Sequence, residues 1–423
     1  MIMNANDMTL GSNAQSMIDR LAEFSSSSDH LTRLYLSTEH QEAAFEVARW
    51  MQEAGLTVSY DAMGTVRGFA PATATGASNK RLLIGSHIDT VVNAGKFDGT
   101  LGVIAAILAL EQIKQRGVKL PFGIDVLAFG DEEGVRFPST LLSSTAIAGG
   151  LNPEVLKSQD RGGISVAQAL EKFEARSGSL NDAAYDPSET IGYLEVHIEQ
   201  GPVLETEDLP LGIVTAIAGA SRIRVTAQGA AGHAGTVPMS LRHDALTAAS
   251  ELILEIETIA RANSTGTLVA TVGEIETSPG AVNVISSETT FSLDIRAAED
   301  VVRRDAIEAI ENAAHSIGAK RGCVIGMERF HNVDTRQCDP GLQELAATAL
   351  SSIDVKPHRM MSGAGHDGQA VAALTNIGML FVRCRDGISH NPLESVTVAD
   401  MDIAVEGLIR WIEAIAEKEG NRS

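Results

Sequence analysis

Cysteine and long apolar runs are both scarce in this sequence of 423 residues. Its three cysteines, Cys323, Cys338 and Cys384, are an odd number at unrelated spacings. They argue against a disulfide scaffold and a close Cys-x-x-Cys zinc site, and favour free thiols in a reducing cytoplasm. No apolar stretch reaches the roughly 18 residues that a membrane helix needs. The N-terminal residues lack a basic region followed by an apolar core, so we expect no signal peptide and a cytoplasmic protein.

Positive charge is also in short supply. The 33 Lys and Arg residues stand against 55 Asp and Glu residues, which gives a net charge of −22. This excess disfavours nucleic acid and anionic membrane surfaces as partners, although a pocket can still be locally positive for a small anionic substrate. The composition, 44% hydrophobic and 21% charged, is that of a soluble globular protein, and the length predicts two or three domains.

The stretch GSHIDTVVNAGKFDGTLG holds the first cluster of chemically active residues. The pattern predicts a buried strand over Arg81–Ser86 before it and an apolar helix over Gly99–Gly117 at its end. His87 and Asp89 then share a face at a strand end, and Asp98 lies just before the helix. A histidine, an aspartate to orient it and a second aspartate are the beginning of a metal site. The same residues can instead cap the helix and bond to backbone groups.

The order of the predicted elements indicates how the domains are arranged. Strands alternate with helices in the first half of the chain, which predicts a mainly parallel sheet with helices on both faces. After about Thr215 the order changes to strand, helix, three strands, helix and strand, without that alternation. We therefore predict one α/β domain made of residues 1–216 and 331–423. A smaller α+β domain, residues 217–330, interrupts it.

Two further motifs place ionisable residues at strand ends. GDEEG puts the adjacent carboxylates Glu132 and Glu133 after a predicted strand. Neighbours on an extended chain face apart, so one can bind a metal while the other takes a proton from water. The alternative is a solvated acidic turn. EVHIEQGP places His197 at another strand end, where a lone histidine is often a core residue.

Glycine-flanked histidines complete the set of candidates. They are His233 in GAAGHAGTVP, His366 in SGAGHDG and His390 in GISHNP. Two metal ions bridged by one carboxylate need about five protein ligands, and oxygen and imidazole donors suit Zn, Mn or Co. The sequence supplies five such donors: His87, Asp98, Glu133, His197 and His390.

These motifs, taken together, resemble those of a known family. GSHIDTVVNAGKFDGTLGV, GDEEGVRFP, EVHIEQGPVLE, GAAGHAGTVPM, SGAGHDG and GISHNPLE look like the M20 metallopeptidase-like amidohydrolases. Within that family they look like the branch of N-carbamoyl-L-amino-acid hydrolases and allantoate amidohydrolases. The motifs occur in the same order over nearly the whole chain, and HIEQGP and SGAGHD separate this branch from the family's peptidases.

The resemblance implies an α/β catalytic domain with a di-metal site. His87 and His197 would ligate one divalent ion, Glu133 and His390 the other, and Asp98 would bridge them. The ions would be Zn or Mn, with Co or Ni as alternatives. The catalytic residues implied are Glu132 as general base, together with Asp89 and His233.

The resemblance also implies the substrate and the role of the inserted domain. That domain would be a lid and the contact of a homodimer. The enzyme would cleave the carbamoyl C–N bond of a small ureido substrate with a carboxylate, allantoate or an N-carbamoyl-L-amino acid, and release ammonia and carbon dioxide. The substrate-binding residues implied are Gln200, His233, Asn283, Arg296, Gly365 and His366.

Arg296 ends the predicted strand Phe291–Arg296, and Ser143-Ser144-Thr145 follows GDEEGVRFP along the chain. The guanidinium of Arg296 is suited to a substrate carboxylate, but it can equally form a salt bridge on an exposed strand face. The branch commonly continues with a Gly-Ser-basic triplet where this chain has Ser143-Ser144-Thr145. That departure leaves the metal motif intact but changes residues near the expected substrate pocket.

Two other functions fit parts of the pattern. An M20 dipeptidase or aminoacylase would keep the metals and cleave a peptide or acyl amide, although HIEQGP and SGAGHD count against it. A catalytically inactive metal-binding homologue would have no need of Glu132, which is intact here.

Overall fold

The computed structural model describes residues 9–264 and 266–421 and divides them into two compact units. The first unit contains the residues up to 215, together with 338–360 and those from 364 onward. The second contains residues 216–337 and 361–363. Each unit has its own hydrophobic core. Among the described residues, no helix is both long enough and apolar enough to pass through a membrane.

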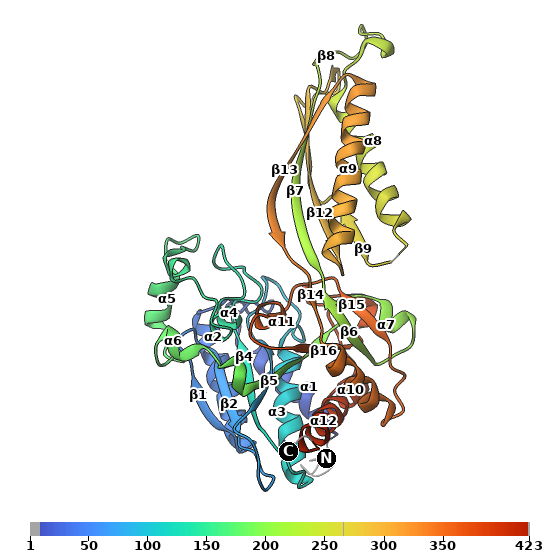
Figure 1. Ribbon diagram of the computed structural model, residues 1–423. Coiled ribbons are helices and arrows are strands. Elements are labelled where there is room, and N and C mark those ends of the chain that lie inside the picture. Colours follow the sequence, from blue (N-terminus) through green and yellow to red (C-terminus); the bar gives the residue numbers. More distant parts are fainter. Residues whose placement is uncertain (1–8, 265, 422–423) are drawn as a thin grey trace. The chain divides into compact units, whose positions relative to one another are not determined.

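The first unit is an α/β structure built on a mixed sheet (Figure 1). Its strand order is β1-β2-β4-β3-β5-β16-β6, and β15 also pairs with β6. The central strands β4, β3, β5 and β16 are parallel, and antiparallel pairs flank them on both sides. The strands are β1 (Thr57–Tyr60), β2 (Val66–Ala70), β3 (Arg81–His87), β4 (Gly123–Phe129), β5 (Thr190–Ile198), β6 (Leu211–Ile217), β15 (Arg359–Ser362) and β16 (Ile377–Val382).

Helices pack against this sheet, and their buried apolar side chains form part of its hydrophobic core. α1, α3 and α10 all pack against α12, and α3 also lies against β3, β4 and β5. The apolar run of α3 is buried on all sides from its first residue to Leu110, which explains why its sequence shows no polar face. The helices are α1 (Leu10–Ala22), α2 (Thr38–Glu53), α3 (Thr100–Gln115), α4 (Leu142–Ile147), α5 (Val166–Lys172), α6 (Leu180–Ala183), α7 (Val203–Thr206), α10 (Pro340–Ser351), α11 (Asp367–Val371) and α12 (Val398–Gly420).

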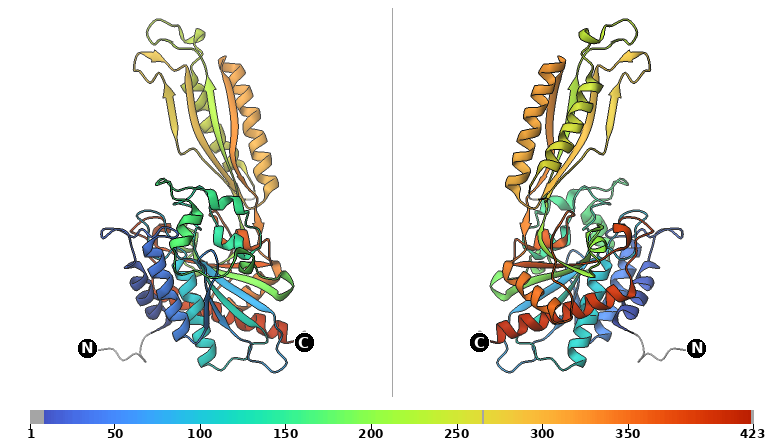
Figure 2. Two further views of the ribbon diagram at one scale, coloured as in Figure 1. Left: turned by 90° about the vertical axis from the view of Figure 1, so that its left-hand side faces the viewer. Right: turned by 90° about the vertical axis from the view of Figure 1, so that its right-hand side faces the viewer.

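The second unit is an antiparallel sheet with two long helices on one face (Figure 2). The strand order is β10-β12-β7-β13, with β9 also paired to β12. Along β7, Ile223 and Val225 are buried while Arg222 and Arg224 are exposed, because alternate residues of a strand face opposite sides. The elements are β7 (Gly219–Gln228), β8 (Gly232–His233), α8 (Ala245–Ala262), β9 (Leu268–Thr271), β10 (Ile275–Ser278), β11 (Val284–Ile285), β12 (Glu288–Ala297), α9 (Asp300–Arg321), β13 (Val324–Val333) and β14 (Arg336–Gln337).

The observed fold class is the one that the sequence predicts, a mainly parallel α/β unit and a smaller α+β unit. The boundary expected at residue 331 is wrong by several residues. Strand β13 continues to Val333, and residues up to 337 belong to the second unit. A short return at 361–363 also belongs to that unit and was not anticipated.

Candidate metal centre and active site

The ends of neighbouring parallel strands place the first candidate residues. β3 runs parallel to β4 on one side and β5 on the other, so their carboxyl ends meet at one edge of the sheet. Ligands bind at such an edge in open α/β folds. His87 ends β3, His197 lies one residue before the end of β5, and Glu132 and Glu133 follow β4. Both histidines are buried.

Asp98 reaches the same place from the start of α3. It is buried and lies just before Gly99, the N-cap of that helix. Gly99 has a φ of 65°, which favours glycine, and a Cβ at this position would lie 2.4 Å from ring atoms of His87. The glycine therefore allows the start of α3 to approach the histidine at the end of β3.

The carboxylate of Asp98 is shared by two groups of donor atoms. Its Oδ1 atom lies 3.4 Å from Nε2 of His87 and 3.0 Å from Nε2 of His197. Its Oδ2 atom lies 3.3 Å from Nε2 of His390, which is in turn 3.4 Å from Oε2 of Glu133. Within each group, His87–Asp98–His197 and Asp98–Glu133–His390, the three donor atoms lie within 4.8 Å of one another.

The orientation of the two buried histidines fits a cation. Nδ1 of His87 lies 3.0 Å from the carbonyl oxygen of Asp89, and Nδ1 of His197 lies 2.9 Å from that of Ile198. These bonds assign the proton to Nδ1 and aim both Nε2 atoms at Asp98, with only 3.4 Å between the two nitrogens. Nitrogen and oxygen lone pairs gathered in this way require positive charge among them, either ring protons or a metal ion.

Asp89 contacts His87 through its carbonyl oxygen, and it also holds the backbone of Glu132 and Glu133. Its two carboxylate oxygens accept hydrogen bonds from the backbone N–H groups of Glu132, at 3.2 Å, and Glu133, at 3.3 Å. The two glutamates do not lie on an extended segment as we expected, because the chain bends after Asp131, whose φ is 66°. Their side chains still have different neighbours: Oε2 of Glu132 lies 3.9 Å from Nε2 of His87, and Glu133 faces His390.

The close packing of charged groups shifts their pKa values. Burial raises the pKa of Glu132 well above its ordinary value, and the charge of Glu133 adds to this while His87 opposes it. Burial raises the pKa of Glu133 to about 7, with the charge of Asp98 adding. The hydrogen bond to Asp98 raises the pKa of His390 to about 9. Burial also works to raise the pKa of Asp98, but His197 and the other histidines hold it well below its ordinary value. The centre therefore attracts positive charge.

Comparison with known proteins identifies the family. Residues 83–414 match the family described as peptidase family M20/M25/M40. The chain belongs to this family. Its members are metal-dependent hydrolases, as the sequence motifs predicted.

Several relatives of this M20 hydrolase are similar over more than nine-tenths of this chain. An allantoate deiminase from Arabidopsis thaliana is 42% identical over 95% of this chain and 82% of its own. An N-carbamoyl-L-amino acid amidohydrolase from Geobacillus stearothermophilus is 40% identical over 92% of this chain and 94% of its own. The solved structure of a hydantoinase/carbamoylase family amidase from Burkholderia multivorans has a TM-score of 0.90 at 28% identity, over 96% of this chain and 98% of its own.

Gln200 lies in the same cluster of the M20 hydrolase. Its Nε2 atom donates to Oδ2 of Asp98 at 2.8 Å and lies 3.5 Å from Nε2 of His390. Gln200, His390 and Asp131 all have φ values between 54° and 66°, a region that non-glycine residues seldom occupy. Such backbone outliers cluster at functional sites, where the surrounding structure holds them in place.

His366, in the SGAGHDG motif, is buried in the structure, whereas we predicted that it binds substrate. Its ring is fully buried and packs edge-on against the ring of His197, with 4.4 Å between centroids, and also contacts Phe381. A ring without accessible surface does not contact substrate in this arrangement, so the structure argues against direct binding by His366. It supports His197 instead. Gly365 is exposed, and its contact with substrate stays a prediction.

Two predicted substrate residues, His233 and Asn283, come together within the second unit. β8 pairs with β11 so that His233 lies opposite Val284, and the carbonyl oxygen of Asn283 accepts a hydrogen bond from Ala234 at 2.9 Å. Both side chains are exposed. Nδ1 of His233 accepts from the N–H of Gly235 at 3.1 Å. Their roles toward a substrate stay predictions.

Arg296, on β12, has an internal partner. Its Nε and Nη2 atoms donate to the two carboxylate oxygens of Asp294, at 2.8 and 3.0 Å, and its Nη1 donates to the carbonyl oxygen of Gly363. The salt bridge that we considered as the alternative thus exists. A substrate carboxylate would have to share or replace the contact with Asp294.

The serine triplet that departs from the branch pattern lies beside the acidic motif. Ser143 is fully buried, and its hydroxyl accepts from the N–H of Gly130 at 2.9 Å and contacts the carbonyl oxygen of the same residue. It therefore fixes the chain just before Asp131 and the two glutamates. Ser144 is also buried.

Two residues close to the centre were not singled out from the sequence. Ser389 and Glu394 lie within the GISHNPLE motif and contact Asp98 or its backbone. The only sign of them in the sequence was their position close to the candidate ligand His390.

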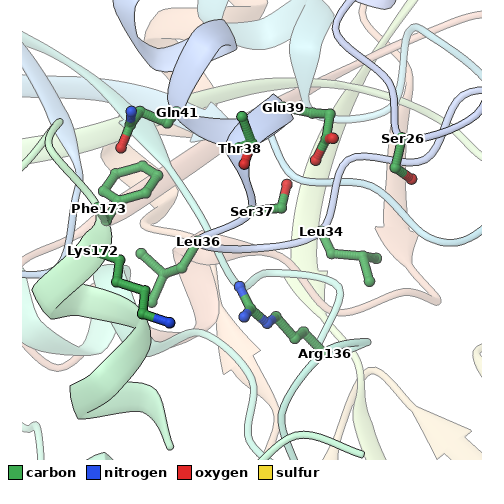
Figure 3. A pocket seen from close by; sticks show the side chains of 10 residues that line it. All are labelled: Ser26, Leu34, Leu36, Ser37, Thr38, Glu39, Gln41, Arg136, Lys172 and Phe173. Atoms are coloured by element: carbon green, nitrogen blue, oxygen red, sulfur yellow. The ribbon is translucent and has the colours of Figure 1, made fainter. Parts of the chain in front are cut away.

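The structure also contains a cavity that is separate from these residues. It has a volume of about 450 Å³ and lies at the start of α2 in the first unit (Figure 3). Arg136, Lys172 and Phe173 contribute to its lining, and none of the candidate residues does. Arg136 is already paired with Asp160 at 3.1 Å, so we assign no function to this cavity.

Proposed function

We propose that this M20 hydrolase is a di-metal amidohydrolase that cleaves the carbamoyl C–N bond of allantoate or of an N-carbamoyl-L-amino acid. The observation that carries the proposal is the position of Asp98 between two groups of donors, with the partly buried side chain of Glu132 beside them. The names of the relatives, allantoate deiminase and N-carbamoyl-L-amino-acid amidohydrolase, support a ureido substrate.

The chain's own residues divide the chemistry between them. Two divalent ions, when bound by the five donors, would acidify a water molecule and polarise the scissile carbonyl. Glu132 takes a proton from the attacking water and returns it to the leaving nitrogen, a role that fits its position, with Oε2 3.9 Å from Nε2 of His87. The carbamoyl carbon gains the water oxygen and loses its bond to the substrate nitrogen. The carbamate released decomposes to ammonia and carbon dioxide.

The second unit supplies the remaining contacts in this proposal. His233 donates to the oxyanion that develops on the carbamoyl oxygen, Asn283 binds the substrate, and Arg296 pairs with its carboxylate. We propose that this unit acts as a lid and as the contact of a homodimer. Sedimentation of the purified protein at several concentrations tests the dimer, and a monomer at every concentration would contradict it.

The metal and the compartment are also part of the proposal. A set of three imidazoles and two carboxylates suits Zn or Mn, with Co or Ni as alternatives. The three cysteines are free and buried, which suits a reducing cytoplasm.

The decisive experiment compares substrates on one preparation. The protein is stripped of metal, reloaded with Mn or Zn, and assayed for ammonia release from allantoate and from N-carbamoyl-L-amino acids. A panel of dipeptides and N-acyl amino acids is assayed in parallel. We expect release from at least one ureido substrate only after reloading. Turnover of dipeptides alone would replace the proposal with a peptidase, and no turnover of any compound with either metal would remove it.

A further inference from the structure

Glu394 connects two segments that carry donors of the candidate centre. It closes the turn after His390, because its N–H donates to the carbonyl oxygen of Asn391 at 3.0 Å. Its side chain is buried, and Oε1 accepts hydrogen bonds from the backbone N–H of Phe97 at 2.8 Å and of Asp98 at 3.1 Å. One side chain thus ties the loop of His390 to the backbone of Asp98.

The hydroxyl of Ser389 makes a second connection between the same segments. Its Oγ atom lies 2.8 Å from Oδ2 of Asp98 and 3.1 Å from Oε2 of Glu394. These two residues therefore hold Asp98 at two points, its own N–H through Glu394 and its carboxylate through Ser389, in addition to the hydrogen bond from Gln200. We call these contacts the Glu394–Ser389 strap.

Gly95 shows how closely the two segments approach. A Cβ at this position would lie 2.3 to 2.4 Å from carbon and oxygen atoms of the Glu394 side chain. Only a residue without a side chain allows the carboxylate of Glu394 to reach the N–H groups of Phe97 and Asp98. Gly95 lies in the NAGKFDG segment that leads to Asp98, and neither Gly95 nor Glu394 is among the candidate ligands.

The two donor groups depend on this strap to different extents. His87 and His197 end two paired strands, and each ring has its own hydrogen bond to a backbone carbonyl. His390 instead lies in a loop, with a φ of 54° and an exposed side chain. The Asp98–Glu133–His390 group therefore has less support from the sheet than the His87–Asp98–His197 group.

We infer that Glu394, together with the Ser389 hydroxyl, is a positioning residue that fixes the Asp98 carboxylate relative to His390 and thereby sets the affinity of one of the two metal positions. This inference rests on the proposed di-metal function. Groups that support metal ligands typically contribute 10–100-fold to affinity. Removing the strap weakens the position formed by Glu133 and His390 and leaves the one formed by His87 and His197.

Metal binding by purified variants tests the strap. The protein is stripped of metal and titrated with Mn or Zn by calorimetry, and the bound metal is counted after desalting. We expect two equivalents for the parent. For Glu394→Ala we expect one tight equivalent and a second one about 10–100-fold weaker. Glu394→Gln keeps an acceptor for both N–H groups, so it should restore most of the second affinity.

A matched control separates positioning from loss of stability. Asp61 is also a buried carboxylate of the first unit and accepts from the N–H groups of Met63 and Thr65 at 2.9 and 3.0 Å. Asp61→Ala should lower the melting temperature but keep two equivalents of metal. If Glu394→Ala does not fold, Ser389→Ala is titrated instead, and it should weaken the second equivalent.

Specific outcomes would overturn the inference. Parent-like binding of both equivalents by Glu394→Ala would do so, as would parent-like binding by Ser389→Ala where Glu394→Ala is unfolded. Equal weakening of both equivalents would also contradict it. Failure of the proposed function is distinguishable, since it would appear in the parent protein as fewer than two equivalents of metal or as no hydrolysis of ureido substrates.

Discussion

The Nε2 atom of His197 lies 3.0 Å from Oδ1 of Asp98, although His197 is in strand β5 and Asp98 lies in the turn before α3. The other carboxylate oxygen, Oδ2, faces His390 at 3.3 Å. The Asp98 side chain thus lies between His197, near the end of strand β5, and His390, on the loop that precedes α12.

Replacing the shared carboxylate should affect both metal positions. Asp98→Asn keeps the shape of the side chain but leaves only one oxygen, since the amide nitrogen is not a ligand. We expect less than one equivalent of tightly bound metal and an activity loss of more than about 100-fold, above the range typical for groups that only support ligands. Metal analysis after desalting measures this, with Asp61→Asn as the control. Two retained equivalents would show that Asp98 does not bridge.

The adjacent glutamates should have separable roles. Glu132→Gln should lower kcat by about 10²–10⁴-fold and keep the metal content, because it removes only the base. Glu133→Gln should lose metal from one position, because it removes a ligand. Steady-state kinetics and metal analysis of the matched pair distinguish the two. The same loss of metal in both variants would mean that Glu132 is a ligand as well.

Metal binding should release protons near neutral pH. In the metal-depleted protein His390 has its pKa raised to about 9 and Glu133 to about 7, so at pH 7 His390 is protonated and Glu133 is about half protonated. A metal ion must displace these protons. Affinity should therefore rise between pH 6 and pH 9. Calorimetry in buffers of different ionisation enthalpy counts the protons released. A pH-independent affinity would contradict the assignment.

The stability of the metal-depleted protein should fall over the same range. The pKa of His390 is raised above its unfolded value near 6.5, so its contribution is fully present below about pH 6.5 and is lost as the pH rises through about 9. Burial raises the pKa of Glu133 from 4.5 to about 7, so the cost of ionising it in the folded state grows as the pH rises above about 4.5 and is complete above about 7. Thermal melts from pH 6 to pH 9 should show a falling melting temperature, and His390→Ala should reduce the slope.

The role of Arg296 can be tested through substrate charge. Arg296→Gln should raise KM for a carboxylate-bearing ureido substrate by about 10–100-fold, which corresponds to one hydrogen-bonded charge pair. Metal content should not change. Asp294→Asn releases the guanidinium from its internal partner and should not raise KM. The amide analogue of the substrate is the control, because its KM should respond little to Arg296→Gln.

The sequence located the donors because their chemistry coincides with strand ends. His87, His197 and the GDEEG segment each follow an apolar run, and parallel strands bring their carboxyl ends to one edge. Residue type and position after a predicted strand were therefore enough to predict that these side chains lie close together. The pairing of Arg296 with Asp294 was also within reach, since residues two apart on a strand share a face.

Other features depend on tertiary contacts that no local pattern encodes. The resemblance implied substrate binding by His366, but packing against His197 and Phe381 buries its ring. Likewise, the bonds of Glu394 join positions nearly three hundred residues apart, 297 for the contact with Phe97. The bend after Asp131 arises from a single residue with positive φ, which its sequence neighbours did not predict.

The burial of α3 has a consequence for how this enzyme fails on heating. Asp98 stands at the entrance of a helix with almost no solvent-facing surface along its first eleven residues, Thr100 to Leu110. Such a helix does not fray or shift by itself, because any displacement would open the interior of the whole unit. Inactivation by heat should therefore coincide with cooperative melting of the first unit.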